Sequence, residues 1–196
     1  MTSLARASDG LARLLRRIAH FGSYLCFAMI LVIMLDVTGR QIPGAQTMTP
    51  WDGVNVFLSS TRLQELEWHL HTAIFALAIG YAYVANAHVR VDLLRERWSS
   101  RRKILTEMAG IAIFVVPYVA TLLLYATEFA AESYALGENS MNPNGMPHRW
   151  VIKAVLAAGL LLILLSAVSV FLRHWQALRD LRQGRYRDGA EWPDAR

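Results

Sequence analysis

The stretch QELEWHLHTAIFALAIGYAYVANAHVRVDLL, residues 64–94, decides the fold. Its middle, residues 68–85, contains no formally charged residue, whereas Glu65 and Glu67 precede it and a basic segment follows it. As a helix, residues 68–85 would rise about 27 Å at roughly 1.5 Å per residue, close to a hydrocarbon core of about 30 Å. Because a backbone in lipid must satisfy its own hydrogen bonds, this stretch predicts a membrane-spanning helix.

The same pattern of an apolar run between polar segments recurs along the chain. The sequence has 196 residues, 55% of them hydrophobic, and a mean hydropathy of +0.29, which is too apolar for an ordinary soluble domain. We therefore expect an all-α bundle of four transmembrane helices, the third of which should be kinked by Pro117. The expected spans are residues 18–38, 68–85, 104–127 and 150–172.

Both ends of the chain are polar extensions of this membrane domain, residues 18–172. Residues 1–17 are basic and amphipathic, and they are interpreted either as a short interfacial helix or as a frayed tail. The first apolar run is long and no small-x-small cleavage site follows it, so we expect an uncleaved anchor helix. Residues 173–196 are expected to form a charged tail.

The distribution of Lys and Arg predicts the orientation. Residues 1–17 contain four, residues 86–103 six and residues 173–196 six, against two in residues 39–67 and one in residues 128–149. Since basic residues remain on the cytoplasmic side, both termini and the middle loop should be cytoplasmic. The same blocks explain the net charge of +5 as membrane topology, so no nucleic-acid partner is expected.

The sequence shows no catalytic or cofactor motif, and we predict neither an enzyme nor a cofactor. A single cysteine, Cys26, excludes a disulfide framework or a CxxC redox pair. The alternative that stays open is a haem-bearing electron-transfer subunit, because the histidines form two layers near the span ends. These layers are His69, His71 and His148 on one side, and His20, His88 and His174 on the other.

Three formal charges lie inside the expected spans: Asp36, Glu107 and Lys153. A charge within the membrane is costly unless it snorkels or is paired. Asp36 and Lys153 lie near the same ends of the antiparallel first and fourth spans, so we predict an ion pair between them that closes the bundle.

Small residues recur at helical spacing in the second and fourth spans. Ala73, Ala76 and Gly80 lie at i, i+3 and i+7, and Ala158 and Gly159 are adjacent in the fourth span. Such residues allow close helix packing. Two interpretations are open: they contact a partner subunit, or they pack this chain's own helices.

Two motifs resemble the small (Q-type) membrane subunit of tripartite ATP-independent periplasmic (TRAP) transporters. The first is LQELEWHL (63–70), an apolar span, HVRVDLL (88–94) and then a basic loop. The second is NPNGMPHRWVIKAVLAAGLLLILL (142–165), in which the family has a Pro-x-Arg-Trp stretch and a Lys. The resemblance covers residues 18–172. The loop 43–62 is longer than usual, which leaves its role undefined.

The resemblance implies a subunit of a sodium-driven importer in the bacterial inner membrane. Its expected partners are a large membrane subunit, which carries the transport sites, and a periplasmic protein that delivers an organic acid or similar solute. The family assigns no catalytic residues to its small subunit. Recurrent family positions, expected to serve folding or subunit contact, are Glu65, Glu67, Trp68, His88, Arg90, Asp92, Pro147, Arg149 and Trp150.

Overall fold

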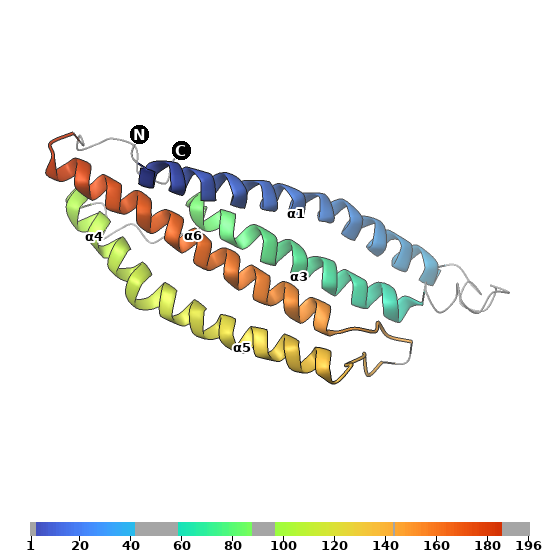
Figure 1. The fold of residues 1–196 in the computed structure, drawn as a ribbon. Helices are drawn as coiled ribbons and strands as arrows, with labels where there is room; N and C mark the ends of the chain where they lie inside the picture. Colours follow the sequence, from blue (N-terminus) through green and yellow to red (C-terminus); the bar gives the residue numbers. More distant parts are fainter. Residues whose placement is uncertain (1–2, 42–58, 88–96, 143, 186–196) are drawn as a thin grey trace.

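The computed structural model of the protein describes residues 3–41, 59–87, 97–142 and 144–185. Successive long helices run in opposite directions and lie side by side (Figure 1). No strand occurs in the described ranges, so the all-α prediction is confirmed there. The helices are α1 (Ser3–Gln41), α3 (Ser60–Val84), α4 (Ser100–Gly110), the π-helix η1 (Ile111–Val115), α5 (Val116–Ala135) and α6 (Trp150–Arg182).

Three helical segments are long and apolar enough, by length and composition, to cross a membrane: α1, the continuous α4–η1–α5 rod, and α6. The predicted second span falls on α3, but α3 is not one of these three. Its first turns are polar, since they contain Glu65, Glu67, His69 and His71. A membrane crossing by α3 therefore stays a prediction.

The basic N-terminal segment is continuous with the first apolar run in one helix of 39 residues. Ser8 and Leu15 are both buried. The hydroxyl of Ser8 donates a hydrogen bond of 3.1 Å to the carbonyl of Ser169 in α6, and the hydroxyl of Ser169 donates one of 3.1 Å to the carbonyl of Ser8. Residues 3–17 thus belong to the bundle, unlike the separate interfacial segment or frayed tail that the sequence suggested.

The C-terminal boundary also differs from the expectation, because α6 continues beyond residue 172 to Arg182. Ala177 and Leu178 are buried against Ile104 and Met108 of α4. The charges of residues 173–196 predict a polar tail, but the apolar residues between 173 and 182 recur at helical spacing and face α4.

The crossing of α3 and α6 depends on glycine. A Cβ at Gly80 would lie 2.9 Å from the carbonyl oxygen of Leu162, and a Cβ at Gly159 would lie 2.8 Å from the Cβ of Ala76. Gly80, Ala76 and Gly159 therefore pack this chain's own helices, whereas Ala158 is exposed. Of the two interpretations of the small residues, packing within the chain accounts for these three.

The distortion expected at Pro117 takes the form of the π-helix η1, in which the N–H of Val116 bonds to the carbonyl of Ile111. Proline at the second position of α5 has no N–H and would clash with the preceding turn of a regular helix. A wider turn relieves this clash, and the α4–α5 rod bends along its length (Figure 1).

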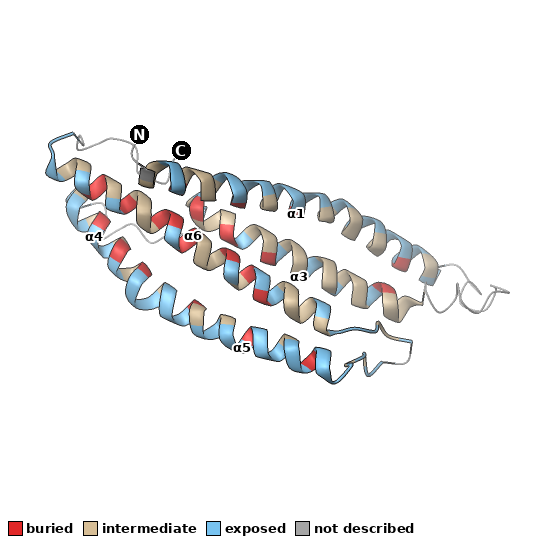
Figure 2. Ribbon diagram, viewed as in Figure 1, coloured by how far each residue is buried: buried red, intermediate tan, exposed pale blue. Residues whose placement is uncertain are grey.

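Helix α6 is the centre of the bundle. It packs against α1, α3, α4 and α5, and it carries more buried positions than any other described helix, whereas α1 and α5 are largely exposed (Figure 2). Large apolar side chains cover the exposed faces of α1 and α5, as expected for helices whose surroundings are lipid or another membrane protein.

Candidate functional site

The loop between α5 and α6, residues 136–149, lies at the end of the bundle where α3 and α6 begin (Figure 1). Gly137 adopts a positive φ of 59° directly after α5, which ends the helix. The two arms of the loop are hydrogen-bonded to each other. The N–H of Ser140 donates to the carbonyl of Met146 at 3.1 Å, and that of Arg149 donates to Glu138 at 3.0 Å.

Glu65 of α3 is the residue around which this loop is organised. Its carboxylate accepts hydrogen bonds from the N–H of Met146 at 2.6 Å, from Nδ2 of Asn142 at 2.8 Å and from the hydroxyl of Ser140. Burial alone would raise the pKa of Glu65, but these three hydrogen bonds, helped by the charge of Arg149, lower it below its usual value. The carboxylate is therefore a fixed anion that joins α3 to the loop.

Gly145 makes this arrangement possible. A Cβ at this position would lie 2.4 Å from the Cβ of Ser140 and 3.0 Å from Oε1 of Glu65. Only a residue without a side chain lets the loop backbone approach the carboxylate so closely.

Glu138 is a second anchor, at the other arm of the loop. Its carboxylate pairs with the ammonium group of Lys153 and accepts a hydrogen bond of 2.7 Å from Ser133, the last buried residue of α5. The bond from Lys153, then that from Ser133, lowers the pKa of Glu138. The Lys153 ammonium also lies 3.7 Å from the ring centroid of Phe129, within cation–π distance.

These contacts correct the predicted ion pair between Asp36 and Lys153. Asp36 is buried, but it pairs with Arg40, one turn later in α1, and accepts a hydrogen bond of 2.7 Å from Ser60 at the start of α3. The prediction assumed that α1 and α6 meet at this end. Asp36 meets α3 there, and the contact of α6 with α1 includes the Ser8–Ser169 pair near the opposite end.

The other family-motif residues lie at several places at this end of the chain's bundle or outside the described residues. Trp150 forms an edge-to-face contact with Tyr134, with ring centroids 5.3 Å apart. Trp68 is 75% exposed, and Glu67 is half-buried beside it on α3. Pro147 and Arg149 are exposed in the loop. The remaining three motif residues, His88, Arg90 and Asp92, lie outside the described residues, as does most of the loop 43–62.

Sequence reasoning missed the structural roles of Glu138 and Gly145, and the hydrogen bond of 2.9 Å from Nε of Arg62 to the carbonyl of Asn144. Glu138 lies in a polar loop, where an acidic residue by itself predicts only a solvated charge. A glycine between two prolines in the sequence, at positions 143 and 147, was the available signal for Gly145. The hydrogen bond from Arg62 joins residues 82 positions apart, so no local sequence pattern predicts it.

The loop end of the bundle presents polar and aromatic side chains at its surface. Within the described ranges, no group of three or more His, Cys, Asp or Glu residues is placed to hold a metal ion. Of the described histidines, only His174 is buried, so no pair of facing, buried histidines supports the haem alternative. Hydrogen bonds hold the described residues of the loop to one another and to Glu65, and Met141, Arg149 and Trp68 are exposed.

Long apolar helices joined by a polar loop are the features of a membrane protein and do not by themselves identify an activity. Residues 29–177 match the model of the family described as tripartite ATP-independent periplasmic transporters, DctQ component, and the chain belongs to that family. No curated protein and no solved structure matches the chain. The resemblance noted in the sequence is thereby confirmed.

Proposed function

We propose that this chain is a small permease subunit that crosses the bacterial inner membrane four times and scaffolds a large membrane subunit. The large subunit would drive uptake of an organic acid or similar solute with sodium, and a periplasmic binding protein would deliver the solute. The observation that carries the proposal is the family match over residues 29–177. The family is that of a transporter component and is not an enzyme family.

The positive-inside bias supports cytoplasmic termini and a periplasmic position for the 136–149 loop. A crossing by α3 is supported by its place between α1 and α6, both of which have membrane-spanning length and composition. In this orientation the loop held by Glu65 faces the compartment of the binding protein. The motif residues Glu65 and Trp150 then serve folding, whereas Trp68, Pro147 and Arg149 are available for subunit contact.

Co-expression tests the scaffolding role. We expect the chain to co-purify with the large membrane subunit, and uptake into proteoliposomes to require both chains together with the binding protein and a sodium gradient. Uptake by this chain alone, or full uptake without it, would show that it is not a scaffold. The same proteoliposomes, loaded with different cations, identify the coupling ion.

Cysteine labelling tests the topology separately. In a Cys26→Ala background, Met141→Cys lies in the loop at a side chain that is 97% exposed, and Arg101→Cys lies in an exposed position at the start of α4. A membrane-impermeant maleimide added to intact spheroplasts should label Met141→Cys and leave Arg101→Cys unlabelled until the membrane is opened. Labelling of both from outside would contradict a four-span topology.

A further inference from the structure

Two donor groups near the C-terminal end of α6 are enclosed but have no hydrogen-bond partner. They are Nη1 of Arg173 and Nε2 of Gln176. The two residues are three positions apart in one helix, so their side chains emerge from neighbouring points on one side of α6. This part of α6 meets the start of α1, because Nε of Arg173 donates a hydrogen bond of 3.2 Å to the hydroxyl of Ser8.

Arg173 also lacks a counter-charge within the described ranges. The described acidic residues at this end of the bundle are Asp9, Glu107 and Asp180, and none of them forms an ion pair with Arg173. Its one described partner is the neutral hydroxyl of Ser8. A half-buried cation with an enclosed, unsatisfied N–H is unfavourable, and an anion with several acceptor oxygens would remove both deficits.

The surroundings of Arg173 and Gln176 are basic. All four arginines of residues 3–17 are exposed, and so are Arg101 and Arg102 at the start of α4. At the opposite end of the bundle the carboxylates of Glu65 and Glu138 already have their donors. The electrostatic field at the end that contains Arg173 therefore favours an anionic ligand.

Aromatic side chains beside arginines indicate that this region lies at the level of lipid headgroups. Trp175 is 38% exposed, and the guanidinium carbon of Arg179 is 5.4 Å from its ring centroid. Tyr81 of α3 accepts a hydrogen bond of 3.2 Å from Nε of Arg16 in α1. Trp and Tyr are enriched at the membrane–water interface, and the apolar run of α6 ends directly before Arg173. A phosphate found at this depth is that of a phospholipid.

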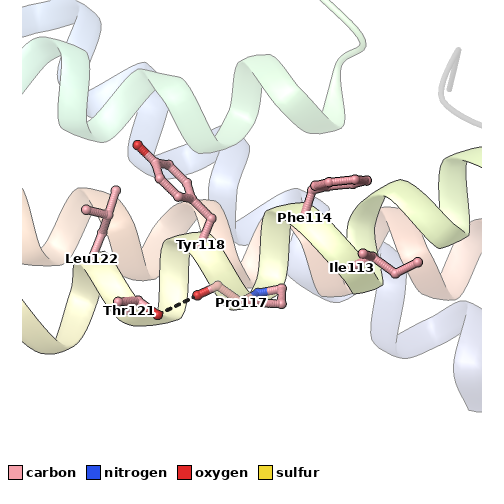
Figure 3. A pocket seen from close by; sticks show the side chains of 6 residues that line it. All are labelled: Ile113, Phe114, Pro117, Tyr118, Thr121 and Leu122. Atoms are coloured by element: carbon pink, nitrogen blue, oxygen red, sulfur yellow. Dashed lines mark hydrogen bonds between the residues drawn. The ribbon is translucent and has the colours of Figure 1, made fainter.

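The shallow groove beside Pro117, on the α4–α5 rod, shows the contrast (Figure 3). Phe114 and Tyr118 stand out from the helix there, and no charged side chain lines the groove. The hydroxyl of Thr121 is committed, since it donates to the carbonyl of Pro117 at 2.9 Å. That groove offers nothing to bind an anion, whereas the end of α6 offers a cation and a second unused donor.

We propose that Arg173 and Gln176, beside the start of α1, bind a phosphate group, and that an anionic phospholipid supplies it. A guanidinium offers parallel N–H groups that match phosphate oxygens, and the amide of Gln176 adds a further donor. The phosphate approaches from the open side of Arg173, whose side chain as a whole is half-buried. In the proposed topology this is the cytoplasmic leaflet, whose surface is negative. The site goes beyond the scaffold role and does not depend on it.

Titration of the purified full-length subunit in a non-ionic detergent tests the ligand. The probes are phosphatidylglycerol, phosphatidylcholine and inorganic phosphate, and the readout is the melting temperature. We expect phosphatidylglycerol to raise it at concentrations at which phosphatidylcholine does not. Equal stabilisation by the two lipids would overturn the anionic ligand. Equal stabilisation by inorganic phosphate would support the phosphate site and overturn the lipid as its source.

A matched pair of charge variants tests the residues. Arg173→Gln removes the proposed ligand-binding cation, and Arg182→Gln removes an exposed charge at the end of the same helix. Loss of hydrogen bonds to a charged group should weaken phosphatidylglycerol binding about tenfold for Arg173→Gln, with no change for Arg182→Gln. Gln176→Leu removes only a neutral donor and should weaken binding about threefold. If Arg173→Gln does not fold, Arg173→Lys takes its place. Unchanged binding by the variants that fold would overturn the site.

A carboxylate of this chain is the competing source of negative charge. Asp92, in the basic segment after α3, lies outside the described residues. A double-mutant cycle of Arg173→Gln with Asp92→Asn, measured as melting temperature in lipid-free detergent, separates the two sources. Additive losses support the phosphate site. Coupling between the two variants would show that Asp92 is the counter-ion of Arg173 and would overturn the proposal.

Discussion

The carboxylate of Glu65 accepts a hydrogen bond of 2.6 Å from the backbone N–H of Met146, although the two residues are 81 positions apart in the sequence. Glu65 lies in the second turn of α3, and Met146 lies in the loop that precedes α6. A hydrogen bond to an ionised acceptor is stronger than one between neutral groups. The bond therefore fixes the start of α6 relative to α3 at the end of the bundle where the proposed partners would approach.

Neutralising this carboxylate should loosen the loop. Glu65→Gln retains the length of the side chain but replaces one acceptor oxygen with a donor, which would face the donors of Met146, Asn142 and Ser140. Because water reaches this end of the helix, we expect a loss of about 1 kcal/mol of unfolding free energy. Thermal unfolding in detergent measures it. Glu67→Gln, two residues along the same helix, is the control and should leave the stability unchanged.

The same contact predicts a dependence on pH. The folded state lowers the pKa of Glu65 below its ordinary value of 4.5, so this stabilisation is complete above that value and is lost as the pH falls through the folded pKa. The pKa of Glu138 is also lowered, and its contribution has the same sign. Protection factors of residues 136–149, which correct for the slower intrinsic exchange in acid, should be high at pH 7 and fall below about pH 4.5. Unchanged protection at pH 3.5 would mean that neither carboxylate holds the loop.

Gly145→Ala should disrupt the loop sterically. The added Cβ would overlap the side chain of Ser140 at 2.4 Å, so the backbone must move away from Glu65. Overpacking of this kind costs about 1–3 kcal/mol, and we expect a loss within that range. Gly39→Ala is the control, since a Cβ at Gly39 meets nothing within 4 Å and the residue is helical. Equal melting temperatures for the two variants would show that the loop readily accommodates the methyl group.

The helices were predictable from sequence, and the contacts of their polar ends were not. The apolar runs and Pro117 located the helical rods because hydropathy and backbone chemistry act locally. The partners of Asp36 and Lys153 depended on which helices are neighbours at one end of the bundle, which local patterns do not encode. Asp36 of α1 accepts a hydrogen bond from Ser60 at the start of α3. Lys153 pairs with Glu138 in a loop whose path depends on Gly145 and Glu65.

Gly80→Ala should destabilise the fold of the chain itself and not merely detach a partner. The new methyl group would lie 2.9 Å from the carbonyl oxygen of Leu162 and 3.0 Å from the hydroxyl of Ser166, so α3 must move away from α6. We expect a loss of about 1–3 kcal/mol, seen as a lower melting temperature of the isolated subunit. Ala158→Leu, at an exposed position of α6, is the control. A Gly80→Ala subunit that is as stable as the wild type but no longer binds the large subunit would favour the interface interpretation instead.

Lys153 should couple energetically to Glu138 and not to Asp36. The ammonium group is mostly enclosed, with 13% of the side chain exposed, and it touches both the carboxylate of Glu138 and the ring of Phe129. Lys153→Met removes the charge and keeps an unbranched apolar chain against Phe129. Glu138→Gln removes the opposite charge but still accepts from Ser133.

If the Lys153–Glu138 pair contributes to stability, the double variant loses less stability than the sum of the losses of the two single variants. The corresponding cycle of Lys153→Met with Asp36→Asn should be additive, because Asp36 has Arg40 and Ser60 as its partners. Melting temperatures of all six proteins in one detergent give both coupling terms. Additivity in the first cycle would mean that the Lys153–Glu138 contact contributes nothing, and coupling in the second would mean that the two spans meet at this end after all.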